Sequence, residues 1–173
     1  MKKLLLISFI ALISWQNYAQ DSDIKWLSFE DAIALNKKNP KKILVDVYTN
    51  WCYYCKVMDK KTYSSSKVAT YINKHFYPVK FNAEQKENLI FNDSIFKYVK
   101  QGRRGYHEFA VALLEGKLSY PTTVFFDAKE QVITRLPGYL TVKNYEPILV
   151  FLGEDYYLSE KWEDFVKKYK NTF

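Results

Sequence analysis

The chain has 173 residues, a formal net charge of +7 and an aromatic content of 18%, with 15 Tyr and 12 Phe residues. This length suits one domain with a single hydrophobic core, in which large rings must fill much of the volume. The basic residues are scattered and form no stripe interleaved with aromatic residues, which argues against a nucleic-acid partner.

The first 19 residues have the pattern of a secretory signal peptide. Two lysines follow Met1, residues 4–13 are almost continuously apolar, and Ala19 offers a small residue at a cleavage point. The apolar run is shorter than the about 20 residues that a spanning helix needs, and no cysteine near the cleavage point could carry a lipid anchor. We therefore expect residues 20–173 to form a periplasmic or secreted domain. An uncleaved membrane anchor is the alternative.

The first predicted elements of this domain are a helix and a buried strand. Ser28 and Asp31 form a capping pattern at the start of a helix over 29–36. The segment 42–49 (KILVDVYT) is apolar on both faces and rich in β-branched residues, which is typical of a buried strand. Asp46 is unusual there, because a buried carboxylate must shift its pKa or find a partner.

A helical crossover and a second strand follow. Residues 55–63 predict a helix, the serines at 64–66 interrupt it, and another helix leads into a strand over 76–84. Two strands joined in this way are typically parallel neighbours in a sheet.

The rest of the chain adds an insert and completes the sheet. The insert covers about 85–119, with a predicted hairpin about Asn92-Asp93 and a predicted helix over 105–116. The further elements are strands over 121–127 and 131–136, a helix from Thr141 and a last helix capped by Ser159. This order predicts an α/β fold with a central mixed β-sheet flanked by helices, and the hairpin-plus-helix insert precedes the third sheet strand.

The only two cysteines, Cys52 and Cys55, lie where the first strand gives way to a helix. Free N–H groups and the helix dipole would stabilise a thiolate at the first cysteine, and the second lies one turn deeper. Cys52 can then attack a substrate disulfide, and Cys55 can resolve the mixed disulfide. A purely structural disulfide would close so small a loop that it would constrain the unfolded chain only weakly. A zinc site lacks a second cysteine pair, and neither histidine is well spaced for one, so we expect no metal.

Three segments carry a resemblance to a known family. KILVDVYTNWCYYCK, YPVKFNAE and YPTTVFF resemble the active-site strand, the following strand and the cis-proline segment of the thioredoxin superfamily, in the expected order over about residues 24–153. The resemblance implies a thioredoxin fold and an exported thiol–disulfide oxidoreductase. It also implies no bound cofactor, because the redox centre is the Cys52–Cys55 disulfide itself.

The resemblance implies catalytic roles for four residues. Cys52 matches the nucleophile, Cys55 the resolving thiol, Asp46 the buried carboxylate beneath Cys55, and Lys80 its lysine partner. A carboxylate held near neutrality could take the proton of Cys55 as a general base. The alternatives are an Asp46 that reaches solvent at the strand end and an ordinary edge lysine at position 80.

Five further residues are expected to bind substrate. Pro121 matches a cis-proline that faces the disulfide, and Tyr120 before it would offer its backbone to an extended substrate segment. Trp51 matches the ring that flanks the site, or else belongs to the core. Tyr53 and Tyr54 suggest an apolar rim for protein substrates, or else pack over the start of the helix.

The expected function is disulfide exchange with protein thiols and disulfides of the cell envelope, by a monomer served by a membrane or soluble redox partner. The Tyr53-Tyr54 pair matches no familiar reductant, isomerase or oxidase, so the redox direction rests on Asp46 and Lys80, which favour a reductant. A dedicated electron shuttle for apocytochrome c thiols stays open. The alternative from another class is a non-catalytic module that binds partners and keeps a structural disulfide. The insert either shapes partner choice beside Pro121 or only completes the core.

Overall fold

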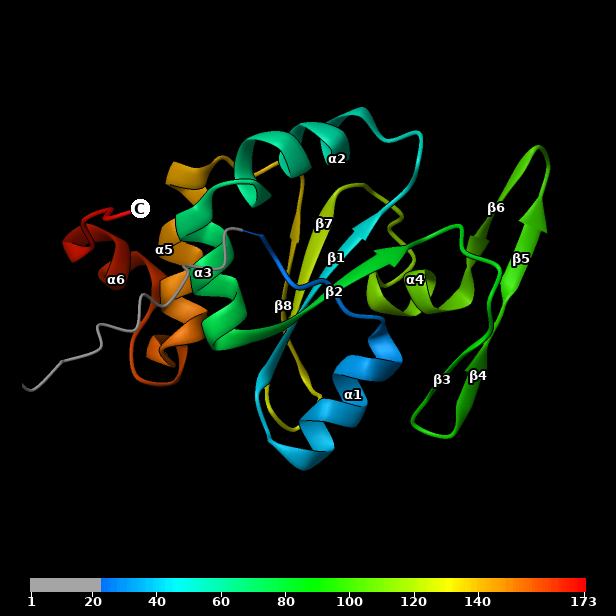
Figure 1. Ribbon diagram of the computed structural model, residues 1–173, viewed down its shortest axis with the longest axis horizontal. Coiled ribbons are helices and arrows are strands. Elements are labelled where there is room, and N and C mark those ends of the chain that lie inside the picture. Colours follow the sequence, from blue (N-terminus) through cyan, green and yellow to red (C-terminus); the bar gives the residue numbers. More distant parts are fainter. Residues whose placement is uncertain (1–22) are drawn as a thin grey trace, which may run out of the picture.

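The computed structural model describes residues 23–173, so the predicted signal peptide over 1–19 lies outside the described residues. Figure 1 shows a central sheet with helices on both faces and two small hairpins at one side. The elements in chain order are α1 (Phe29–Lys38), β1 (Lys42–Tyr48), α2 (Tyr53–Met58), the π-helical segment η1 (Asp59–Tyr63), α3 (Ser66–His75), β2 (Phe76–Asn82), β3 (Leu89–Phe91), β4 (Ser94–Phe96), β5 (Tyr98–Gln101), β6 (Arg104–His107), α4 (Glu108–Leu113), β7 (Thr122–Phe126), β8 (Val132–Pro137), α5 (Val142–Gly153), the 3-10 helix η2 (Tyr156–Leu158) and α6 (Trp162–Lys168).

The four-stranded sheet has the order β2-β1-β7-β8. β1 and β2 are parallel, whereas β7 is antiparallel to both β1 and β8. The middle residues of β1 and all of β7 are buried, because helices cover both faces of these strands. The predicted α/β fold with a mixed, helix-flanked sheet is therefore confirmed.

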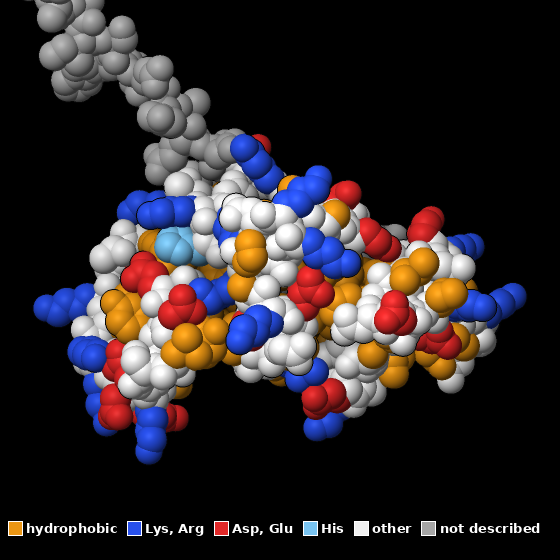
Figure 2. Space-filling view, turned by 90° about the horizontal axis from the view of Figure 1, so that it is seen from below, with side chains coloured by type: hydrophobic (Ala, Val, Ile, Leu, Met, Phe, Trp, Pro, Cys, Tyr) orange, Lys and Arg blue, Asp and Glu red, His pale blue; other side chains and the backbone are white. Residues whose placement is uncertain are grey.

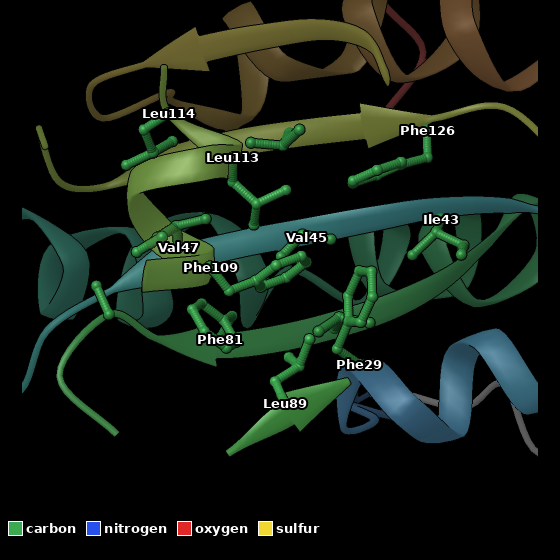
Figure 3. Close-up of a cluster of buried hydrophobic side chains, with 14 of the residues drawn as sticks. Phe29, Ile43, Val45, Val47, Phe81, Leu89, Phe109, Leu113, Leu114 and Phe126 are labelled. Atoms are coloured by element: carbon green, nitrogen blue, oxygen red, sulfur yellow. The ribbon is translucent and has the colours of Figure 1, made fainter. Parts of the chain in front are cut away.

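The two faces of β1 belong to two hydrophobic clusters. Ile43, Val45 and Val47 pack in one cluster with α1, α4 and β3, and Figure 3 shows Phe29 and Phe109 pointing toward these strand residues. Leu44 lies in the other cluster, with Met58 of α2, Tyr63 of η1 and residues of α3 and α5. Because side chains alternate along a strand, Asp46 shares the face of Leu44, which α2 and η1 cover.

The insert differs from its prediction in one respect. The hairpin about Asn92-Asp93 is present as β3–β4, with φ of 49° and 59° at its two turn residues. The expected helix over 105–116 begins only at Glu108, because residues 98–107 form a second hairpin, β5–β6, that we did not predict. A side chain at Gly105 would collide with the Tyr98 ring and the Val99 carbonyl group, so the hairpin needs glycine there.

His107 joins the insert to the core. Its Nδ1 atom accepts a hydrogen bond from the Phe109 N–H at 3.2 Å, so the imidazole caps α4. Nε2 can then donate to the Glu87 carbonyl oxygen at 3.0 Å. The ring is fully buried against Phe81.

The last helix begins later than predicted. α6 starts at Trp162 after Lys161, and Ser159 ends the 3-10 helix η2 instead of capping α6. The chain turns at Asp155, whose φ is 63°, and this turn separates α5 from η2. No helix among residues 23–173 is long and apolar enough to cross a membrane.

A buried carboxylate in α5 holds the C-terminal end of the chain. Glu146 accepts hydrogen bonds from the Tyr169 hydroxyl, the Asn171 amide, the backbone N–H and hydroxyl of Thr172, and the Phe173 N–H. Burial alone would raise the pKa of Glu146, but these hydrogen bonds lower it below its ordinary value of 4.5. The ionised Glu146 carboxylate therefore holds residues 169–173 against α5 through hydrogen bonds.

Replacing Glu146 with Gln should lower the free energy of unfolding by about 2–4 kcal/mol at neutral pH, because several charge-assisted bonds are lost and an amide nitrogen would face donors. A lowered folded-state pKa contributes stability above the ordinary pKa of 4.5 and loses it as the pH falls through the lowered value. Urea unfolding at about pH 7 and pH 3 should therefore show a large deficit at the higher pH and a small one at the lower.

The exposed Glu163 in the first turn of α6 offers a matched control, since Glu163→Gln removes the same charge without a buried partner. Equal unfolding free energies for Glu146→Gln and the wild-type protein at pH 7 would contradict the assigned role of Glu146.

Figure 2 shows the face that lies away from α2. Lys and Arg side chains are interspersed there with Asp and Glu, and the exposed hydrophobic side chains form several separate groups. This face therefore carries no field of a single sign.

Candidate active site

Cys52 and Cys55 form a disulfide at the start of α2. Cys52 is the N-cap residue, and its Sγ atom accepts a hydrogen bond from the Cys55 N–H at 3.1 Å. The Cys52 N–H donates to the Thr49 carbonyl oxygen at 3.1 Å, which holds the turn between β1 and α2. Cys52 is 5% exposed and Cys55 is 2% exposed, so the first sulfur is the more accessible one.

This position favours a thiolate at Cys52 once the disulfide is reduced. The Cys55 N–H is already directed at the sulfur, and the first turn of α2 contains no acidic residue. A helix N-terminus stabilises negative charge through its free N–H groups and its dipole, which lowers a thiol pKa. The geometry therefore suits Cys52 as an attacking thiolate.

Aromatic rings surround the disulfide at the surface. Trp51, Tyr53 and Tyr54 are 48%, 71% and 59% exposed, so none of the three is a core residue. Tyr54 stacks on Tyr139, with ring centroids 6.5 Å apart, and Trp51 meets the Tyr120 ring edge-on at 6.1 Å. We call Trp51, Tyr53, Tyr54, Tyr120 and Tyr139 the aromatic rim.

The segment before β7 reaches the same end of the sheet. The Tyr120–Pro121 peptide bond is cis. Thr122 pairs with Val47 of β1, so Pro121 lies beside the end of β1, just before the turn to Cys52. Burial, followed by the charge of Glu84, raises the pKa of Tyr120 to about 12, so its hydroxyl stays protonated. No backbone hydrogen bond to another residue of 23–173 engages Tyr120.

Beneath α2, Asp46 forms a buried ion pair with Lys80. The Lys80 Nζ atom lies 2.6 Å from Asp46 Oδ2, and the two residues are neighbours in the β1–β2 register. The other oxygen of Asp46, Oδ1, is buried and has no hydrogen-bond partner within the described chain. Asp46 therefore does not reach solvent at a strand end, and Lys80 is not an ordinary edge lysine.

A third charged group, Asp59 of η1, completes this cluster. Lys80 donates to Asp59 Oδ1 as well as to Asp46, and the side chain of Asp59 is partly exposed. Ring centroids of Trp26, Tyr48 and Tyr63 lie 5.0, 5.1 and 5.1 Å from the Lys80 ammonium, so aromatic faces also stabilise the cation.

The pKa values of Asp46 and Lys80 are both raised. Burial raises the pKa of Asp46, and the attraction of Lys80 offsets only part of that rise. Burial lowers the pKa of Lys80, but Asp46 and Asp59 outweigh it, so the pKa of Lys80 is raised. Both shifts favour the protonated forms, so the Asp46 carboxylate is a stronger base than an ordinary one.

An open cavity connects the cluster with solvent. The cavity has a volume of about 440 Å³, and its lining includes Trp26, Asp59, Tyr63 and Lys80. A proton released by Asp46 can therefore leave past Lys80 and Asp59 without crossing the core. Another cavity of about 440 Å³, lined mostly by apolar side chains, lies between β8, α5 and α6.

Besides Tyr139 of the aromatic rim and the rings around Lys80, three charged residues at the site were not predicted from the sequence: Asp59, Glu84 and Arg104. Asp59 follows Cys55 by four residues, so a helical projection from Cys55 could have found it. Glu84 accepts a hydrogen bond from the Trp51 indole N–H at 3.0 Å. Arg104 of the insert lies over the same ring, with its guanidinium carbon 4.4 Å from the ring centroid. Nothing in the sequence indicated either of these two contacts.

Residues 23–173 contain no group of three or more His, Cys, Asp or Glu side chains that could hold a metal ion. The groups gathered at the described site are the two sulfurs, the buried Asp46–Lys80 pair and the surrounding rings.

The sequence pattern of the thioredoxin-like domain family matches residues 29–153. A thioredoxin-fold protein from Helicobacter pylori is 25% identical, with a TM-score of 0.58 over 75% of this chain and 80% of that chain. A candidate disulphide isomerase from Bacteroides thetaiotaomicron is 26% identical, with a TM-score of 0.54 over 81% of this chain and 98% of that chain. The oxidoreductase DsbH is 18% identical, with a TM-score of 0.57 over 89% of this chain and 94% of that chain. This similarity shows a shared fold. No curated protein matches the sequence.

Proposed function

Since the chain belongs to the thioredoxin-like domain family, we propose that it exchanges disulfides with proteins of the cell envelope and acts there as a reductant. The observation that carries this proposal is the placement of Cys52 at the N-cap of α2, on the sheet face that holds the buried Asp46–Lys80 pair. A periplasmic or secreted location rests on the predicted signal peptide.

The reaction would proceed in two steps. The Cys52 thiolate attacks one sulfur of a substrate disulfide and the substrate S–S bond breaks. A mixed disulfide forms, and the other substrate sulfur leaves as a thiolate, which takes a proton from water. Asp46 then takes the proton of Cys55, and the Cys55 thiolate attacks Cys52 Sγ. The Cys52–Cys55 disulfide forms, and the substrate leaves with two thiols. Two electrons have passed to the substrate, so a membrane or soluble donor must reduce the protein again.

Substrate would bind along the aromatic rim. Tyr120 has a free backbone beside the disulfide, so it can pair with an extended segment as a strand does. The exposed rings of Trp51, Tyr53 and Tyr54 offer apolar contact on the other side. These contacts would hold the substrate sulfur in line with Cys52.

Alkylation after mild reduction separates this function from a non-catalytic module with a permanent disulfide. We expect low-millimolar dithiothreitol to make Cys52 available to iodoacetamide within minutes, because Cys52 is the more exposed and anion-stabilised cysteine. We also expect a standard potential nearer to about −270 mV than to about −120 mV, the values of a reductant and of a strong oxidant with this chemistry.

Protein that is left oxidised serves as the control for alkylation of other nucleophiles. A disulfide that resists reduction would favour the non-catalytic module, and a potential near that of the strong oxidant would overturn the reductant direction.

A further inference from the structure

The β5–β6 hairpin of the insert reaches the redox site. Figure 1 shows this hairpin rising toward the end of the molecule that carries α2. At that end, the Arg104 guanidinium carbon lies 4.4 Å from the centroid of the Trp51 ring, and Trp51 directly precedes Cys52. A charged side chain of the insert therefore lies beside the path of any substrate that approaches Cys52.

The hairpin carries charge of one sign. Lys100, Arg103 and Arg104 are exposed, and residues 98–107 include no Asp or Glu. Within residues 23–173, none of these three side chains makes an ion pair or a hydrogen bond. A guanidinium that lies over a ring keeps its N–H donors free for a carboxylate.

A carboxylate at the edge of the Trp51 ring, Glu84, is already engaged. Glu84 accepts the hydrogen bond from the Trp51 indole N–H, so it lies at the edge of the ring that Arg104 covers. Asp59, beneath α2, is already paired with Lys80. The hairpin itself thus carries only positive charge, in contrast to the mixed charge of the face in Figure 2.

We propose that this hairpin selects disulfides whose cysteine is followed or preceded closely by Asp or Glu, with Arg104 receiving the carboxylate. The inference rests on the proposed function and names its substrate class. An extended segment advances about 3.3 Å per residue, so a carboxylate one to three residues from the attacked sulfur can reach a group that lies over Trp51. Arg103 and Lys100 would add longer-range attraction.

The test uses pre-reduced protein in single turnovers with two peptide disulfides that differ only in Asp and Glu against Asn and Gln beside the cysteine. We expect the second-order rate constant to be about tenfold higher for the acidic peptide at low salt. The ratio should fall toward one in about 0.5 M NaCl, where surface charges are screened.

Variants assign this preference to the hairpin. Arg104→Gln should reduce the ratio to about twofold, whereas Arg104→Lys should keep most of it because the charge remains. Lys129→Gln is the control, since Lys129 is an exposed lysine in the β7–β8 turn, at the opposite end of β7 from Pro121.

Equal wild-type rates for the two peptides, or an equal loss of both rates in Arg104→Gln, would overturn the inference. Failure of the wild-type protein to reduce either peptide would instead overturn the proposed function.

Discussion

Replacement of Cys52 by Ser should lower the rate of insulin-disulfide reduction by about a thousandfold or more, because a hydroxyl at the N-cap remains protonated and is a poor nucleophile. Cys55→Ser should behave differently. Cys52 still attacks, but no second thiolate can release the substrate, so mixed disulfides between Cys52 and substrate should accumulate. Activity can be followed by insulin precipitation, and the mixed disulfides by mass spectrometry without reductant.

The two variants are controls for each other. Each loses the same Cys52–Cys55 disulfide and changes one sulfur to oxygen, so any loss of stability is closely matched. A difference in activity between the two variants therefore reports which cysteine keeps its thiol, and not a difference in folding. Wild-type activity in both variants would contradict the assignment, and so would accumulation of mixed disulfides in Cys52→Ser alone.

Much of the fold could be predicted because the sequence pattern and the chain order agree. The apolar, β-branched run at 42–49 is typical of a strand that is buried on both faces, and a helical crossover to residues 76–84 favours parallel pairing of the two strands. The turn at Asn92-Asp93 was found because both residues tolerate positive φ. These features are determined by residues that lie close together in the sequence.

The elements that were missed depend on contacts between distant segments. The β5–β6 hairpin has short strands with basic residues and no apolar alternation, and it is held by the buried His107 and by a glycine against the Tyr98 ring. Ser159 has the residue type of a helix cap, but the turn at Asp155 delays α6 until Trp162. Local preference could not reveal either tertiary constraint.

The candidate site shows the same division. The spacing of Cys52 and Cys55 predicts the disulfide because both cysteines lie in one helical turn. Whether Lys80 meets Asp46 depends on the β1–β2 register, which pairs these two residues directly. The pairing was expected from a family resemblance alone, and the partly exposed Asp59, which gives Lys80 a second carboxylate, was not expected at all.

Replacing Asp46 with Asn should slow the resolving attack of Cys55 by about a hundredfold near neutral pH, because the variant lacks a general base. The first attack by Cys52 should change far less. The wild-type resolving rate should rise with pH through the raised pKa of Asp46, because only the ionised carboxylate can accept a proton. Rapid quenching of the mixed disulfide at several pH values measures both steps. Asp93→Asn is the control, since it removes an exposed carboxylate in the β3–β4 turn and leaves the Asp46 cluster intact.

The same substitution should change the pH dependence of stability. A folded-state pKa above the ordinary 3.8 means that the native state holds the proton longer than the unfolded chain, so wild-type stability falls as the pH rises between the two values. Each unit of elevation costs about 1.4 kcal/mol once both states are ionised. An amide side chain cannot ionise, so Asp46→Asn should gain stability relative to the wild-type protein as the pH rises from about 4 through the raised pKa of Asp46. Parallel stability curves for the two proteins, together with unchanged resolving rates, would show that the buried carboxylate neither holds the proton nor moves it.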